Sequence, residues 1–195
     1  TADFHNSEVL EYMVSKFGRF VTNKLILNII GQSKSSFDFR KVMDEGKILL
    51  IKLSKGAIGD LNTQLLGLVL VARIQMAAMS RVDIPEEERK DFFLYVDEFQ
   101  NFATESFGNI LSEARKYRLA LILANQYIAQ LVQSVGGSKS TAVRDAIFGN
   151  VGTIVSFRVG AEDAEYLEKE FAPEFAATDI VNLAKYNVYL KLMID

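Results

Sequence analysis

The stretch FFLYVDEFQNF, residues 92–102, is an apolar run that ends in two adjacent carboxylates, Asp97 and Glu98. A short, nearly continuous apolar run is typical of a strand that is covered on both faces in a parallel sheet. In open α/β sheets, ligands bind beyond the carboxyl ends of the strands. The pattern therefore predicts that two acidic side chains lie where a ligand would bind.

Similar elements alternate along much of the chain. Other short apolar runs predict strands at 47–53, 119–124, 151–157 and 187–194. Apolar residues at helical spacing predict helices at 60–81, 106–117, 142–148 and 162–171. Strands that alternate with helices predict an α/β fold with a mostly parallel sheet flanked by helices. We expect one domain over residues 1–195, with a mixed helical lead-in at 1–45 and an α/β core at 46–195.

Composition narrows the possible sites. The 195 residues are 49% hydrophobic and contain no cysteine, which excludes disulfides and thiolate metal sites. The single histidine, His5, has no evident partners for a triad or a zinc site. The net charge of −3 argues against a domain that binds DNA over its whole surface. The apolar run Leu65–Ala72 is interrupted by Arg73 and is shorter than the roughly 20 residues of a membrane span. We therefore expect no membrane span in this chain and a cytoplasmic location, with upstream segments able to hold the protein at the inner face of the membrane.

The next predicted strand also ends in polar side chains, Asn125 and Gln126. An amide at the end of a neighbouring strand can contact a phosphate or an attacking water. Arg115 and Arg118 precede this strand at the end of a helix, where cations also occur for dipole reasons alone. The simpler alternative is that the acids and amides cap strand ends and loops without any further role.

Four stretches in this order resemble the HerA–FtsK superfamily of ring-forming motor ATPases: KILLIKLSKG, FFLYVDEFQNF, SEARKYRLALILANQYIAQL and FGNVGTIVSFRVGAEDAEYL. The resemblance covers residues from about 40 to 195. It is closest to the TraG-like coupling proteins and related ATPases of conjugative transfer and type IV secretion. It implies part of a RecA-like P-loop NTPase core.

The resemblance also implies roles for individual residues. Asp97 matches the Walker B aspartate, which holds Mg²⁺, and Glu98 matches the catalytic glutamate, which orients the attacking water. Gln126 matches the sensor glutamine at the end of the next strand. These three positions imply ATP and Mg²⁺ as cofactors of the whole protein.

An arginine finger is the remaining catalytic part that the resemblance implies. Arg115 falls where coupling proteins carry an arginine that reaches the nucleotide of the neighbouring subunit. Such a finger can contribute about 10³–10⁵ in rate. Arg118, Arg144 and Arg158 are rivals for this role.

A phosphate-binding P-loop requires the pattern G-x-x-x-x-G-K-[ST]. The nearest match, NIIGQSKS at 28–35, has Asn28 and Ser33 at the two glycine positions, and we reject it. The stretch VGGSKST at 135–141 also lacks the pattern. We expect that the chain begins after the P-loop of a longer protein, binds ATP poorly by itself and hydrolyses it negligibly.

The resemblance therefore predicts the C-terminal part of a motor that couples ATP hydrolysis to the translocation of DNA or protein. The implied partners are nucleotide, DNA, further copies in a homo-hexamer and proteins of the secretion machinery. Lys139 and the segment 54–59 are candidate contacts in the pore of such a ring. The alternative is a recognition or scaffold domain that has the same fold and does not hydrolyse ATP.

Overall fold

The computed structural model describes residues 18, 23–103, 105–135 and 138–193. His5 lies outside the described residues. The chain divides into two compact units, residues 1–90 and 91–195. This division describes how compactly each part is packed and does not define functional domains. The assignment of all 195 residues to one motor domain stays a prediction.

Helices and short 3₁₀ turns form the described part of the first unit. Side chains cap two of the helices, because Asn23 accepts from the Leu25 and Ile26 N–H groups and Asp38 accepts from the Lys41 N–H group. The elements are α2 (Lys24–Ile30), α3 (Phe39–Asp44), α4 (Lys55–Ile58), α5 (Asp60–Met79), η1 (Ser80–Asp83) and η2 (Glu86–Glu88).

Helix α5 is the longest element and follows the predicted helix at 60–81 closely. The segment 60–83 is long and apolar enough to cross a membrane, and 33% of its most apolar window is buried inside the protein. The core helix of a soluble protein passes the same test, so length and composition assign no membrane role to α5.

A charged network joins α3 to η1. The Arg81 side chain is fully buried, and its Nε lies 3.1 Å from a carboxylate oxygen of Asp44. Arg81 also donates to the Lys90 carbonyl at 2.7 Å. Arg40 contacts both Asp44 and Asp83. Burial lowers the pKa of the Arg81 guanidinium, and the nearby Asp44 carboxylate opposes that effect.

The strand predicted at 47–53 is absent from the described structure. These residues lie outside any helix or strand, and the side chains of Ile48 and Leu50 are 89% and 90% exposed. A strand needs a neighbour to complete its ladder of hydrogen bonds. The described part of residues 1–90 contains no strand that could serve as that neighbour.

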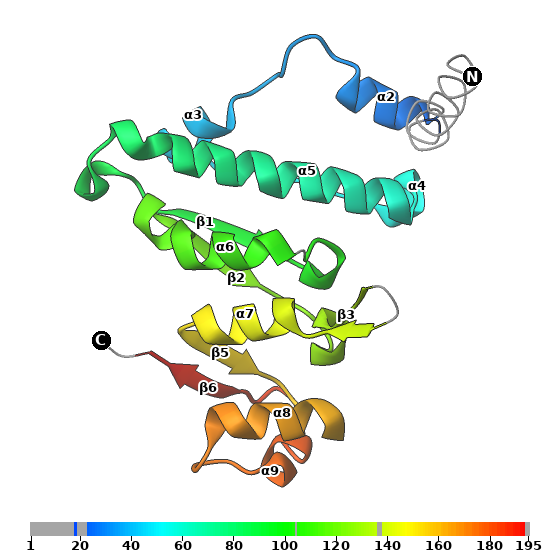
Figure 1. The fold of residues 1–195 in the computed structure, drawn as a ribbon, viewed down its shortest axis with the longest axis vertical. Helices are drawn as coiled ribbons and strands as arrows, with labels where there is room; N and C mark the ends of the chain where they lie inside the picture. The colour runs from blue at the N-terminus through cyan, green and yellow to red at the C-terminus, as the bar shows by residue number, and fades with distance from the viewer. Residues whose placement is uncertain (1–17, 19–22, 104, 136–137, 194–195) are drawn as a thin grey trace, which may run out of the picture. The chain divides into compact units, whose positions relative to one another are not determined.

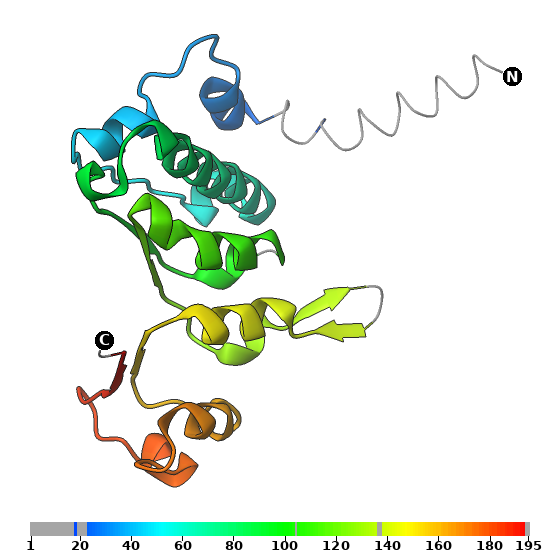
Figure 2. The same ribbon diagram turned by 60° about the vertical axis from the view of Figure 1, so that its left-hand side comes forward.

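The second unit alternates strands with helices, as the sequence predicted (Figure 1). Its elements are β1 (Phe92–Val96), η3 (Phe99–Asn101), α6 (Glu105–Glu113), η4 (Ala114–Tyr117), β2 (Leu119–Leu123), η5 (Ile128–Leu131), β3 (Gln133–Val135), β4 (Ser138–Ser140), α7 (Ala142–Asn150), β5 (Thr153–Ser156), α8 (Ala161–Phe171), α9 (Ala177–Val181) and β6 (Tyr189–Leu192). The short β3–β4 hairpin extends from the start of α7 (Figure 2).

These strands form three separate pairs. β1 and β2 are parallel, whereas β3–β4 and β5–β6 are antiparallel. The α/β class is confirmed, but the described strands differ from the single, mostly parallel sheet that we expected. Residues 157–188, which include α8 and α9, connect β5 to β6, and the two strands pair in antiparallel.

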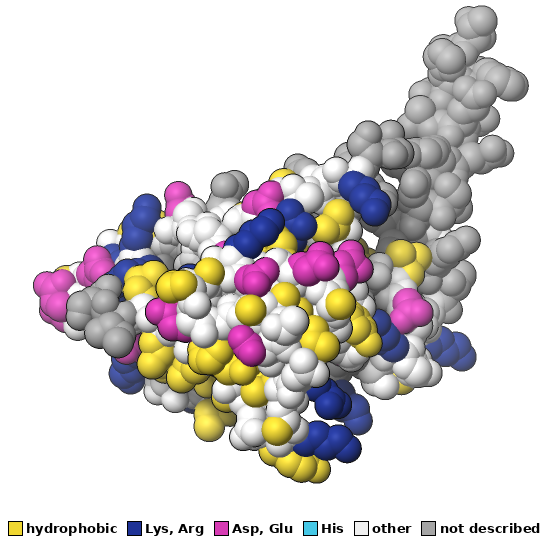
Figure 3. Space-filling view, turned by 90° about the horizontal axis from the view of Figure 1, so that it is seen from below, with side chains coloured by type: hydrophobic (Ala, Val, Ile, Leu, Met, Phe, Trp, Pro, Cys, Tyr) yellow, Lys and Arg dark blue, Asp and Glu magenta, His cyan; other side chains and the backbone are white. Residues whose placement is uncertain are grey.

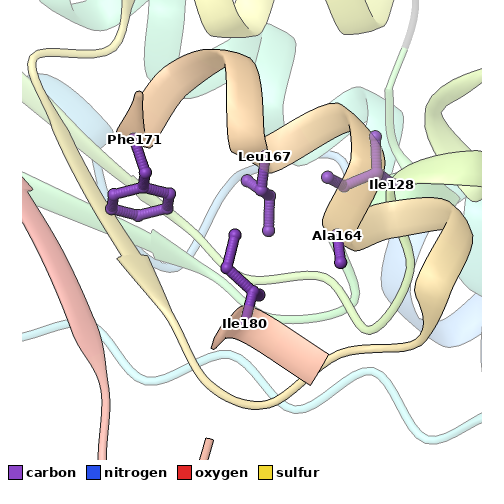
Figure 4. Close-up of a cluster of buried hydrophobic side chains, with 5 residues drawn as sticks. All are labelled: Ile128, Ala164, Leu167, Phe171 and Ile180. Atoms are coloured by element: carbon purple, nitrogen blue, oxygen red, sulfur yellow. The ribbon is translucent and has the colours of Figure 1, made fainter. Parts of the chain in front are cut away.

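The clearest apolar core of the second unit lies beneath α8 (Figure 4). Ala164, Leu167 and Phe171 follow helical spacing, so they share one face of α8. Ile180 from α9 and Ile128 from η5 complete the cluster, which we call the α8 cluster.

The β5–β6 pair has one covered and one exposed face. Ile154 and Tyr189 pack against the α8 cluster. Val155 and Leu190 are paired in the ladder and are about half exposed, at 54% and 50%.

Apolar and charged side chains are interspersed on the molecular face shown in Figure 3.

Candidate functional site

The parallel pairing of β1 and β2 brings their carboxyl ends together. Val96 is opposite Leu123, and the Ala124 N–H group donates to the Val96 carbonyl at 2.9 Å. The Phe99 N–H group then donates to the Ala124 carbonyl at 3.0 Å, which continues the contact past the end of β1. The two acids that follow β1 and the two amides that follow β2 therefore lie at the same edge.

Glu98 sits at a sharp turn of the backbone. Its φ of 51° and ψ of 44° are left-handed, a conformation that costs a residue with a side chain about 1–2 kcal/mol. Local hydrogen bonds support the turn, because the Glu98 N–H group donates to Asp97 Oδ1 at 2.9 Å and Asn101 Nδ2 donates to the Glu98 carbonyl at 2.9 Å. Strained backbone of this kind often occurs at functional sites.

Two amide groups hold the Glu98 carboxylate. Gln126 Nε2 donates to Glu98 Oε1 at 2.5 Å, and Gln100 Nε2 donates to Oε2 at 2.5 Å. The structure therefore brings the predicted residues Glu98 and Gln126 into direct contact. The role of that contact in catalysis stays a prediction.

An aromatic pair anchors this turn to the helix that follows. Phe99 and Phe107 are each 1% exposed, and their ring centroids are 4.5 Å apart. Phe107 belongs to α6, which lies along one face of the β1–β2 pair (Figure 1). A buried aromatic contact therefore anchors the polar turn that carries Glu98.

Asp97 is exposed and follows β1 directly. One of its oxygens accepts from the Glu98 N–H group. Among the described residues, no group of three or more carboxylate or imidazole side chains could enclose a metal ion. A single carboxylate fits Mg²⁺, because this ion keeps several waters and commonly takes one or two carboxylates together with substrate phosphates.

The candidate finger residues lie elsewhere. Arg115 is exposed in η4, which precedes β2, so it lies at the opposite end of the β1–β2 pair from Glu98. Five residues of strand separate these ends by roughly 15 Å. Arg118 also precedes β2, and its guanidinium lies 3.5 Å from Asp91. Neither arginine shares the edge that carries Glu98 and Gln126.

Arg144 packs on the rim of the α8 cluster. Its guanidinium lies 4.6 Å from the centre of the Tyr166 ring and 3.0 Å from an Asp145 oxygen. The Thr141 hydroxyl and then Arg144 lower the pKa of Asp145, while burial raises the pKa of Tyr166. The contacts with Tyr166 and Asp145 give Arg144 a structural role in packing beside the α8 cluster. Arg158 is exposed beyond β5.

The segments considered for phosphate or pore contacts lie partly in helices and strands, and residues 136 and 137 of the stretch 135–141 lie outside the described residues. Asn28 lies in α2, and its carbonyl accepts from the Gln32 side chain. Residues 55–58 of the segment 54–59 form α4 rather than a loop. Lys139 is exposed in β4 of the hairpin.

Sequence reasoning missed two side chains that support the site. Gln100 was visible as an amide two residues after Glu98, but spacing alone does not show which way it points. Asp163 gave no signal, because an acid in the first turn of a helix is common. Asp163 is 6% exposed, and its oxygens accept from the Ile128 N–H group at 3.1 and 3.2 Å. It therefore fixes the chain two residues beyond Gln126.

Comparison with known families bears on this same region. Residues 91–181 match the family described as the TraM recognition site of TraD and TraG. The match starts immediately before β1, ends with α9 and contains Asp97, Glu98 and Gln126. It supports a TraG-like coupling protein of conjugative transfer. No curated protein and no solved structure shows significant similarity to the chain.

Proposed function

We propose that the chain is the C-terminal part of a ring-forming motor ATPase of a conjugative coupling protein, within the HerA–FtsK superfamily. The observation that carries the proposal is the contact between Glu98 and Gln126 at the shared end of two parallel strands. An acid and an amide placed at this edge suit a site that orients a water beside a phosphate. The family match supports the setting in conjugation.

Each side chain has a distinct part in this proposal. Asp97 would hold Mg²⁺, which supplies charge neutralisation at the phosphates. The Glu98 carboxylate accepts a hydrogen bond from the attacking water and thereby orients it. Gln126, beside it, donates to Glu98 and has an amide that can also contact the transferred phosphate.

The placement of Arg115 is compatible with a role in the neighbouring subunit. A residue about 15 Å from Glu98 along the strand direction cannot reach the phosphates bound at Glu98 of its own chain. In a homo-hexameric ring, the same residue can reach the site of the next subunit. Mixing Arg115→Ala subunits with wild-type subunits tests this role, because a finger defect lowers turnover at wild-type sites as well.

The decisive experiment is Glu98→Gln in the full-length protein, with MgATP binding and turnover measured together. We expect nucleotide binding to be retained and turnover to fall at least about 10²-fold, since general acid–base groups contribute roughly 10²–10⁴. Unchanged turnover would remove Glu98 from the mechanism. The 195-residue chain alone should bind MgATP poorly, because no stretch of its sequence has the P-loop pattern. A micromolar dissociation constant measured by calorimetry would contradict this expectation.

A second candidate function is recognition of a relaxosome protein, and the family match favours it. We propose that the region 91–181 also docks a TraM-type partner of the coupling protein. Calorimetry with the 195-residue chain and such a partner should detect binding, and Glu98→Gln should leave that binding unchanged. Absence of binding would contradict recognition by this chain and would leave the ATPase proposal standing.

A further inference from the structure

The turn after β1 supplies Glu98 with a second amide donor in addition to Gln126. Gln100 comes from η3, whereas Gln126 comes from the segment after β2. Each amide occupies a different oxygen of the same carboxylate. We propose that Gln100 is a positioning residue that keeps the Glu98 carboxylate oriented while Gln126 exchanges its contact for the phosphate or the attacking water. This inference rests on the proposed ATPase function.

The two donors differ in how firmly they are held. Gln100 directly follows Phe99, which is buried against Phe107 of α6, and the Gln100 side chain is itself half-buried. Gln126 is exposed beyond the end of β2. Water competes less with a hydrogen bond made by a sheltered donor. Gln100 is therefore the fixed donor, and Gln126 is the donor that can leave.

The orientation of the Gln100 amide follows from the same contact. Its oxygen is buried and has no hydrogen-bond partner among the described residues. A flipped amide would direct this oxygen at the negatively charged carboxylate of Glu98, which repels it. The nitrogen therefore faces Glu98, and that contact outweighs the cost of the unpaired oxygen.

This arrangement predicts a division of tasks during turnover. When Gln126 turns away, Glu98 Oε1 becomes available to accept from the attacking water. Gln100 still holds Oε2, so the carboxylate does not rotate away from the reacting geometry. Loss of such alignment can cost about 10²-fold in rate even when binding is intact.

The test uses the full-length protein and a substitution that removes the donor but keeps the length of the side chain. Gln100→Met should lower kcat for ATP hydrolysis by about tenfold or more, with KM for MgATP changed by less than about twofold, because only orientation is lost. Gln130→Met is the matched control, since Gln130 is an exposed glutamine of η5. It should leave both constants unchanged.

A second variant separates donation from space filling. Gln100→Glu keeps the shape of the side chain and opposes Glu98 with a like charge, so positioning predicts a loss of kcat at least as large as for Met. A residue that only fills space predicts wild-type kcat for Gln100→Met, which keeps the length of the side chain, and that result would overturn the inference. Thermal unfolding of Gln100→Met should remain cooperative, with a Tm lowered by only a few degrees, since one hydrogen bond is lost while the apolar contact between Phe99 and Phe107 remains.

The failure of this inference differs from the failure of the proposed function. If the wild-type full-length protein does not hydrolyse ATP, the ATPase proposal is wrong, and if Glu98→Gln retains turnover, the catalytic role of Glu98 is wrong. If Glu98→Gln abolishes turnover while Gln100→Met has wild-type kcat, only the role of Gln100 is wrong. A raised KM with unchanged kcat for Gln100→Met would likewise overturn positioning, because it would assign the contact to substrate binding.

Discussion

The α8 cluster and the turn that carries Glu98 belong to the same compact unit, yet they are held by different forces. The cluster is a set of aliphatic and aromatic side chains at 0–9% exposure (Figure 4). The turn combines a left-handed backbone with partly exposed hydrogen bonds to Gln100, Asn101 and Gln126. Burial of apolar area stabilises the α8 cluster, whereas directional hydrogen bonds hold the turn at Glu98 in its conformation.

One residue connects the two regions. The Ile128 side chain belongs to the α8 cluster, and its N–H group is held by the buried Asp163 carboxylate. Ile128 follows Gln126 by two positions. The α8 cluster therefore stabilises the segment that follows Gln126, and Gln126 in turn contacts the strained, polar turn at Glu98.

The largest expected effect is a loss of stability in the α8 cluster. Leu167→Ala removes a side chain that is 4% exposed and leaves a cavity between α8 and α9. We expect a loss of about 2–5 kcal/mol in the free energy of unfolding, measured by urea denaturation of the 195-residue chain. Leu190→Ala, at a half-exposed position of β6, is the matched control and should cost less than about 1 kcal/mol. Equal losses for the two variants would contradict the assignment of the cluster as a core.

The next effect concerns the link between the regions. Asp163→Ala leaves the buried Ile128 N–H group without its acceptor and should cost about 1–3 kcal/mol. Hydrogen exchange at the Ile128 amide should become faster than in wild type. Glu165→Ala, at an exposed position of the same helix, should change neither quantity. Unaltered exchange at Ile128 in Asp163→Ala would show that Asp163 does not fix this segment.

A smaller effect compares backbone strain at the site with the same strain elsewhere. Tyr186 has a φ of 67° and is 97% exposed, so its side chain contributes little packing. Tyr186→Gly should raise the free energy of unfolding by about 0.5–1 kcal/mol, because glycine removes the strain of about 1–2 kcal/mol but gains entropy in the unfolded chain. Glu98→Gly relieves similar strain but also loses the bonds from Gln100 and Gln126, so it should not stabilise the chain. Stabilisation by Glu98→Gly would mean that those bonds contribute nothing.

The smallest effect is a pH dependence at the rim of the cluster. The Thr141 hydroxyl and Arg144 lower the pKa of Asp145 below its ordinary value of 3.8. The stabilising contribution is therefore present above pH 3.8 and is lost as the pH falls through the lowered pKa. Thermal unfolding between pH 6 and pH 2 should show a smaller acid-induced decrease for Asp145→Asn than for wild type. A decrease of the same size in both proteins would remove Asp145 from the acid response.

Much of the second unit was predictable because its local patterns agree with its tertiary environment. The apolar runs at β1 and β2 predicted strands, and the pattern at 162–171 predicted the helix α8. The family match covers this same part of the chain. Residues 47–53 have an equally apolar pattern but lie outside any strand, since a strand also depends on a neighbour that local sequence does not supply.

The sequence by itself determined that two acids and an amide follow successive strands, because the order of residues and the apolar runs are local properties. It also determined the absence of thiolate chemistry, since the chain has no cysteine. Only the tertiary structure decided that β6 runs antiparallel to β5 and that Gln100 faces Glu98. The pairing of β6 with β5 depends on contacts between residues that are distant in the sequence. The direction of the Gln100 side chain depends on the left-handed turn at Glu98, a backbone conformation that residue type does not fix.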